Sequence, residues 1–149
     1  MKTMKKQLLM MVVSAFFLML TAGVSEAQQM RLMRATIPFD FNVGNISLPA
    51  GRYAIERSST GGVLQLVSLD GKKSIFFSTL EAQNGKPQSR AQLEFHRYGT
   101  EHFLSQVRQW GDTRYEIRKS KREREVAKKV DRHLAKNNEE LEIVMIEGQ

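Results

Sequence analysis

The sequence predicts an all-β domain, a small antiparallel sandwich or partly open barrel, followed by a C-terminal amphipathic basic helix. Three observations support this fold class: short stretches of alternating apolar and polar residues, turn signals between them at intervals of about 8–12 residues, and a late charged segment with helical period. The chain of 149 residues has no cysteine and a formal net charge of +7. Because cysteine is absent, disulfide scaffolds, Cys-ligated metal sites and thiol nucleophiles are excluded.

The N-terminal segment, residues 1–27, has the pattern of a signal peptide. Three lysines within the first six residues precede an apolar run at residues 8–20, and a small-x-small exit ends at Ala27. We predict cleavage after Ala27 and export to the periplasm or the extracellular space, with no membrane span afterwards. The alternative is an uncleaved anchor, but the apolar run of 13 residues is short against the ~20 that a spanning helix needs.

The first expected strand covers residues 37–43. Its apolar side chains alternate with polar ones, so all of them belong to one face; they are Ile37, Phe39, Phe41 and Val43. Pro38 has no amide hydrogen to donate, which places this strand at an edge or at its own start.

A turn at residues 48–51 and a strand at residues 52–57 follow. Pro49 and Gly51 suit the second and fourth positions of a type I turn. In the strand, Tyr53 and Ile55 share one face.

The Asp70-Gly71 pair predicts a two-residue hairpin turn, because both positions of such a turn must accept a positive φ. In that register Leu66 faces Ile75, and Leu64 faces Phe77. Both pairs fall on one face of the hairpin, so turn chemistry and hydrophobic pattern favour the same alignment.

A second hairpin is expected around Gly99. With Gly99 at the centre of the turn, Phe95 pairs with Phe103, and His96 faces His102. A Gly99-Thr100 two-residue turn would slip the register by one and move Phe103 to the other face, so we favour the first alignment. One more short strand is expected around Tyr115, after a turn at residues 110–112.

The C-terminal part begins with a capping box, in which Ser120 and Glu123 each satisfy a free amide. An apolar stripe follows at helical spacing and is expected to dock the helix on the sheet; it consists of Val126, Ala127, Val130 and Leu134. Residues 141–146 are β-prone and able to add an edge strand. The expected organisation is signal peptide 1–27, linker 28–34, β-domain 35–118, basic helix 119–137 and acidic, apolar tail 138–149.

Positive charge is concentrated in the helix. Residues 35–117 carry nine basic and eight acidic side chains, whereas residues 118–136 carry nine basic and three acidic ones. Cations at a helix N-terminus oppose the helix dipole, which points to an anionic envelope component or a protein partner; the candidate contacts are Lys121, Arg122, Lys128 and Lys129. The alternative is a solvated face with (i, i+4) ion pairs. No stacking aromatics accompany this segment, so nucleic acid is not an expected partner.

A second candidate surface is the aromatic rim formed by Arg97, Tyr98 and Trp110, since Tyr, Trp and Arg are enriched in contact patches. The alternative role for these residues is to close one end of the β-core. A cross-strand pair of His96 and His102 falls short of the three or four ligands of a metal site. No catalytic constellation, metal site or cofactor motif is found, and we expect no enzyme activity.

Four motifs occur in a fixed order along the chain: Ile37-Pro38-Phe39-Asp40-Phe41-Asn42-Val43-Gly44, Leu48-Pro49-Ala50-Gly51-Arg52-Tyr53, Phe95-His96-Arg97-Tyr98-Gly99 with Phe103-Leu104-Ser105-Gln106-Val107, and Lys119-Ser120-Lys121-Arg122-Glu123-Arg124-Glu125. With these motifs the chain resembles a family of small, signal-peptide-bearing proteins of unknown function from environmental Gram-negative bacteria. The likeness covers nearly all of residues 35–129 and implies export and a compact β-rich domain. It brings no activity and no catalytic residue.

Together these observations predict an exported, non-enzymatic binding or structural module of the cell envelope. The alternative is a small-ligand carrier that uses the β-core as a cup.

Overall fold

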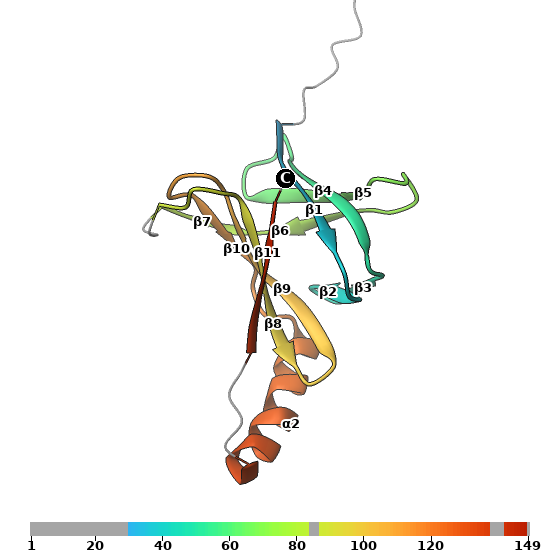
Figure 1. The fold of residues 1–149 in the computed structure, drawn as a ribbon, viewed down its shortest axis with the longest axis vertical. Helices are drawn as coiled ribbons and strands as arrows, with labels where there is room; N and C mark the ends of the chain where they lie inside the picture. The colour runs from blue at the N-terminus through green and yellow to red at the C-terminus, as the bar shows by residue number, and fades with distance from the viewer. Residues whose placement is uncertain (1–29, 84–86, 138–141, 149) are drawn as a thin grey trace, which may run out of the picture.

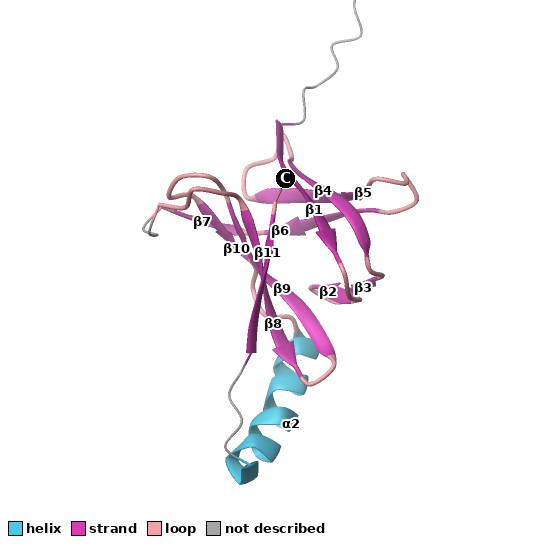
Figure 2. Ribbon diagram, in the orientation of Figure 1, coloured by secondary structure: helices cyan, strands magenta, loops and turns pink. Residues whose placement is uncertain are grey.

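The computed structural model describes residues 30–83, 87–137 and 142–148, with side chains described up to Val130 and again from Glu142. Two mainly antiparallel sheets pack as a sandwich, and one helix follows them near the C-terminus (Figures 1 and 2). The predicted all-β fold with a C-terminal helix is confirmed, and the sheets do not close into a barrel. The expected signal peptide at residues 1–27 lies outside the described residues.

The first sheet has four strands in the order β1-β4-β5-β6. Their bounds are Met30–Ile37 for β1, Gly51–Arg57 for β4, Val63–Ser68 for β5 and Ser74–Ser78 for β6. β1 begins at Met30, so the expected linker at residues 28–34 is wrong from that residue onward. Pairing with β4 explains the difference, because Met33 and Ala35 become core residues when the strand is extended.

The second sheet follows the path β11-β8-β9-β10-β7, with a short hairpin of β2 and β3 beside β9. Its bounds are Phe41–Val43 for β2, Ile46–Leu48 for β3, Leu80–Ala82 for β7, Gln92–Tyr98 for β8, Glu101–Arg108 for β9, Arg114–Glu116 for β10 and Glu142–Glu147 for β11. β11 pairs with β8 and forms an edge of this sheet, so the β-prone tail does add an edge strand.

The chain passes from one sheet to the other at residues 38–40, so the single strand expected over residues 37–43 is wrong. β1 ends at Ile37 in the first sheet, and β2 starts at Phe41 in the second. Pro38 cannot donate to a ladder, which favours a break here. The alternating apolar side chains nevertheless all reach the core between the sheets, because Phe39 packs against it from the connection itself.

The Asp70-Gly71 hairpin is confirmed in its predicted register. Leu64 pairs with Phe77 and Leu66 with Ile75, and Gly71 has a φ of 72°. Tyr53 and Ile55 also lie buried on one face of β4, as predicted.

The register predicted for the β8–β9 hairpin is wrong. Tyr98 pairs with Glu101 and His96 with Phe103, which is the two-residue Gly99-Thr100 turn. Phe103 does move to the other face, but it stays buried there against the ring of Tyr98, at 5.8 Å between centroids. A β-bulge at Ser105 then restores the core face further along the hairpin.

The tight turn makes Gly99 sensitive to substitution. Its φ is 63°, and a Cβ built there would meet no atom within 4 Å, so backbone strain is the main cost. We expect Gly99→Ala to lower the free energy of unfolding by about 1–2 kcal/mol, measured by urea denaturation. Gly61→Ala is the control, since Gly61 has equal space and no positive φ; equal losses in the two variants would contradict this origin.

The core between the sheets is filled by apolar side chains from nearly every strand. Leu93, Phe95 and Val107 of the second sheet are 0% exposed, and Tyr53, Ile55 and Leu66 of the first sheet meet them in the same cluster.

The helix, α2 (Lys121–Asn137), begins beside the tip of the β8–β9 hairpin and projects beyond it (Figure 1). No helix among the described residues is long and apolar enough to cross a membrane.

Candidate binding surface

The first turn of α2 is fixed to the second sheet by a group of polar side chains that we call the clasp: His96, Tyr98, Lys119 and Glu123. Glu123 is only 4% exposed. Its carboxylate lies 3.1 Å from Nδ1 of His96 and accepts a hydrogen bond from the Tyr98 hydroxyl at 3.3 Å. The Lys119 ammonium donates to the same hydroxyl at 3.0 Å. Each member of the clasp therefore has a hydrogen-bonding partner, as buried polar groups require.

The capping box is confirmed in one half only. The amide of Glu123 donates to Oγ of Ser120 at 3.1 Å, as predicted. The Glu123 side chain, which the sequence pattern assigns to the Ser120 amide, instead extends to the sheet and joins the clasp. A carboxylate in the first turn is also favoured by the helix dipole.

Burial raises the pKa of the Tyr98 phenol, Glu123 raises it further, and Lys119 opposes both effects. The phenol therefore stays protonated at neutral pH and donates a hydrogen bond to Glu123. This fixes the direction of the hydrogen bonds from Lys119 through Tyr98 to Glu123.

A second connection lies at the side of the clasp. Arg122 donates to Glu101 at 2.8 Å and to Oγ of Ser47 at 3.2 Å. The Ser47 hydroxyl in turn donates to Asn42 at 2.6 Å, and Asn42 donates to the carbonyl of His102 at 3.1 Å. Arg122 thus connects the helix to the β2–β3 and β8–β9 hairpins of the second sheet.

These contacts add a polar connection to the expected docking of the helix. The sequence places the apolar stripe on the sheet, but the hydrogen bonds and ion pairs between α2 and the sheet come from Arg122 and Glu123 in its first turn. Val126, Ala127 and Val130 are half-buried and share the clasp side of the helix. The placement of the Leu134 side chain lies outside the described residues.

The opposite side of α2 forms what we call the cationic face: Lys121, Arg124 and Lys128. These residues are three and four positions apart, so they lie within about 60° of one another around the helix axis. All three are exposed, and within residues 30–83, 87–130 and 142–148 none of them forms an ion pair or hydrogen bond through its side chain. Glu125 and Lys129 flank this face, and their charges cancel.

The sequence-predicted helix residues therefore separate into two groups. Lys121 and Lys128 lie on the cationic face and Lys129 at its margin, whereas Arg122 is bound to Glu101. Arg124 was missed by the sequence prediction, although its spacing from Lys121 and Lys128 in a helical projection is the signal that identifies it.

The aromatic rim predicted from Arg97, Tyr98 and Trp110 is not assembled. Tyr98 is buried in the clasp, and Arg97 extends from the other face of β8 to Glu142 of β11, at 2.8 Å. Trp110 is 76% exposed and follows the far end of β9, a strand about 23 Å long at 3.3 Å per residue. The three residues therefore do not form one surface.

The two histidines of the hairpin also separate. His96 joins the clasp, while His102 lies on the other face and stacks on Phe39 with ring centroids 3.9 Å apart. Burial is the main cause that lowers the pKa of His102, and Arg97 adds to it. Within the described part of the chain, no group of three or more His, Asp or Glu side chains is arranged to hold a metal ion.

Comparison of the chain with protein-family models, with curated proteins and with solved structures finds no match. Two of the motifs behind the family resemblance meet in the clasp, since His96 and Tyr98 come from one motif and Lys119 and Glu123 from another.

Proposed function

We propose that this chain is an exported, non-enzymatic binding module of the cell envelope, and that the cationic face of α2 binds an anionic envelope component. The main support for the proposal is that Lys121, Arg124 and Lys128 are exposed and unpaired among the described residues. They lie on a helix that projects from the β-sandwich (Figure 1).

The position of these cations also supports a binding role. Positive charge in the first turns of a helix opposes its dipole, by about 0.3–1 kcal/mol for each residue at low ionic strength. The chain offsets this cost with Glu123, whose carboxylate occupies the clasp, and leaves Lys121 and Arg124 facing outward. An arrangement selected only for folding would place acids at these exposed positions.

Export is part of the same proposal and is supported by the signal-peptide pattern of residues 1–27. The small-ligand cup remains a prediction without a specific observation behind it, since the described core between the sheets is occupied by side chains.

Charge reversal on the helix tests the proposal. The variant Lys121→Glu/Arg124→Glu/Lys128→Glu is compared with Arg31→Glu/Arg34→Glu/Arg90→Glu, which reverses three exposed cations on the sandwich. Binding is measured to vesicles that contain phosphatidylglycerol and to polygalacturonate, a soluble acidic polysaccharide. At about 1 kcal/mol for each cation near an anionic surface, the helix variant should bind roughly 100-fold more weakly.

The helix variant is expected to fold, because acids near a helix N-terminus agree with the dipole. Binding of the unchanged protein should also weaken as salt is added, since exposed charges are screened. Loss of binding in the sandwich variant alone, or binding of neither probe by the unchanged protein, would contradict the proposal.

A further inference from the structure

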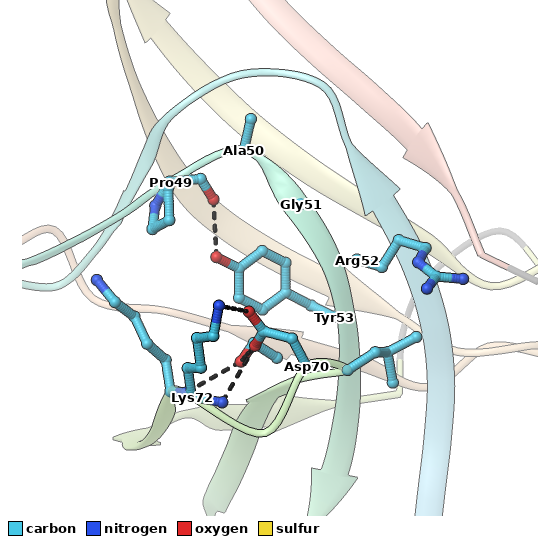
Figure 3. Close-up of a pocket in the computed structure, with 10 residues that line it drawn as sticks. Pro49, Ala50, Gly51, Arg52, Tyr53, Asp70 and Lys72 are labelled. Carbon is cyan, nitrogen blue, oxygen red and sulfur yellow. Dashed lines mark hydrogen bonds and ion pairs between the residues drawn. The ribbon is translucent and has the colours of Figure 1, made fainter.

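A second concave site lies on the sandwich, apart from the helix. The connection from β3 to β4 and the β5–β6 turn enclose a hollow of about 390 Å³, lined by Pro49, Tyr53, Asp70 and their neighbours (Figure 3). This volume is within the range of small-molecule sites, about 300–1,000 Å³. The hollow is open on one side and has both apolar and charged walls.

The walls of the hollow are held in place by hydrogen bonds. The Tyr53 hydroxyl donates to the carbonyl of Pro49 at 2.7 Å, and the Leu69 amide donates to the carbonyl of Arg52 at 2.9 Å. On the other side, Ser68 donates to Asp70 at 2.5 Å and accepts from the amide of Lys73 at 3.0 Å. The site is thus formed before any ligand arrives, which lowers the cost of binding.

The acidic groups near the hollow already have partners. Asp70 accepts from Ser68 and from the Lys72 amide, and its carboxylate lies 3.6 Å from the Lys72 ammonium. These hydrogen bonds, first of all that from Ser68, lower the pKa of Asp70. Asp40, at the back of the connection, accepts from the Ala50 amide at 2.8 Å.

The remaining charge at the hollow is positive. Neither Arg52 nor Lys73 has a side-chain hydrogen bond or ion pair to any residue in the described ranges. Figure 3 shows Tyr53 between Lys72 and Arg52, so that cationic groups lie on both sides of the aromatic ring. Lys72 is paired with Asp70, so a ligand seated against Pro49 and the ring meets two further cations, Arg52 and Lys73, that no described residue neutralises.

Tyr53 has no catalytic part in this site. Its pKa is raised, chiefly by burial and further by Asp70 and Asp40, so the phenol is neutral at physiological pH. Its hydroxyl is occupied by Pro49. The hollow thus offers a fixed apolar wall and unpaired cations, a combination suited to binding.

We propose that this hollow binds a small organic anion, a phosphate or carboxylate carried on a compact ring such as a sugar. Arg52 and Lys73 line the hollow and attract the anionic group, and Pro49, Leu69 and the edge of Tyr53 contact the ring. This site is independent of the cationic face on α2, and its test does not depend on that function.

The test uses the full exported protein and three probes of similar size: glucose 6-phosphate, glucuronate and neutral glucose. Binding is followed by NMR, through the amide signals of residues 49–53 and 68–73, at millimolar ligand. We expect saturable shifts with at least one anion and none with glucose. The double variant Arg52→Glu/Lys73→Glu should weaken binding by at least about tenfold, since two cations that line the hollow become anions.

Arg31→Glu/Arg90→Glu, with two exposed cations reversed outside the hollow, is the matched control and should leave these shifts unchanged. A response to only one of the two anions identifies which anionic group the site prefers. Equal shifts with glucose, no shifts with either anion, or equal weakening in the control would overturn the proposal.

Discussion

Replacement of Phe95 by alanine should lower the free energy of unfolding by about 3–5 kcal/mol. Phe95 is 0% exposed in the centre of the second sheet. Its ring makes edge-to-face contacts with Phe39 and Phe41, at 5.3 and 5.6 Å between centroids. The substitution leaves a cavity at the point where the chain passes between the sheets.

This loss is large against the total stability of a domain, about 5–15 kcal/mol. Urea denaturation followed by far-ultraviolet circular dichroism measures it. Phe76→Ala is the control, because Phe76 is the same residue type on an edge strand and is 58% exposed. If both variants lost the same stability, Phe95 would not be the centre of the core.

Replacement of Glu123 by alanine is expected to release the first turn of α2 from the sheet. The change removes the Glu123 carboxylate, which is the shared hydrogen-bond partner of His96 and the buried Tyr98. An unsatisfied buried group costs about 1–3 kcal/mol, which corresponds to a roughly 5- to 150-fold rise in amide hydrogen exchange. The effect should be confined to the first turns of the helix and the tip of the β8–β9 hairpin.

Glu125→Ala is the matched control, because Glu125 lies two residues further along the same helix and is exposed. Both substitutions raise helix propensity equally, so a difference between them reports the contacts of Glu123. Equal exchange rates in the two variants would mean that the clasp does not hold the helix.

Local chemistry was enough to predict the Asp70-Gly71 hairpin. Its turn residues and its two apolar cross-strand pairs favour one register, and no distant residue alters it. The alternation of residues 37–43 likewise predicted that Phe39 and Phe41 reach the core. The division of that segment between two sheets depends on pairing with β4 and β9, which lie far away in the sequence.

The β8–β9 register was missed because two long-range features compensate for the shorter turn. Tyr98 covers Phe103 on the outer face, and the bulge at Ser105 returns Val107 to the core. Similarly, Ser120 and Glu123 were found as a local capping pattern. The pairing of Glu123 with His96, 27 residues away, has no local signal.

The candidate site was predicted in part. Lys121 and Lys128 follow from the charge distribution, because their positions depend only on helix geometry. The engagement of Arg122 by Glu101, and the burial of Tyr98, depend on how the helix meets the sheet. Because of those contacts, neither Arg122 nor Tyr98 is available on the surface that the sequence predicted for it.

We propose that the cationic face of α2 is where the chain meets its partner. Site-specific photo-crosslinking in the cells that export the protein tests it most directly, with the reactive group placed at Arg124 or Lys128 in separate experiments. Arg34, which is exposed on the sandwich, serves as the control position. We predict an adduct from both helix positions that disappears when Lys121 is also changed to Glu, and none from Arg34. Adducts from Arg34 alone, or none from the helix, would contradict the account.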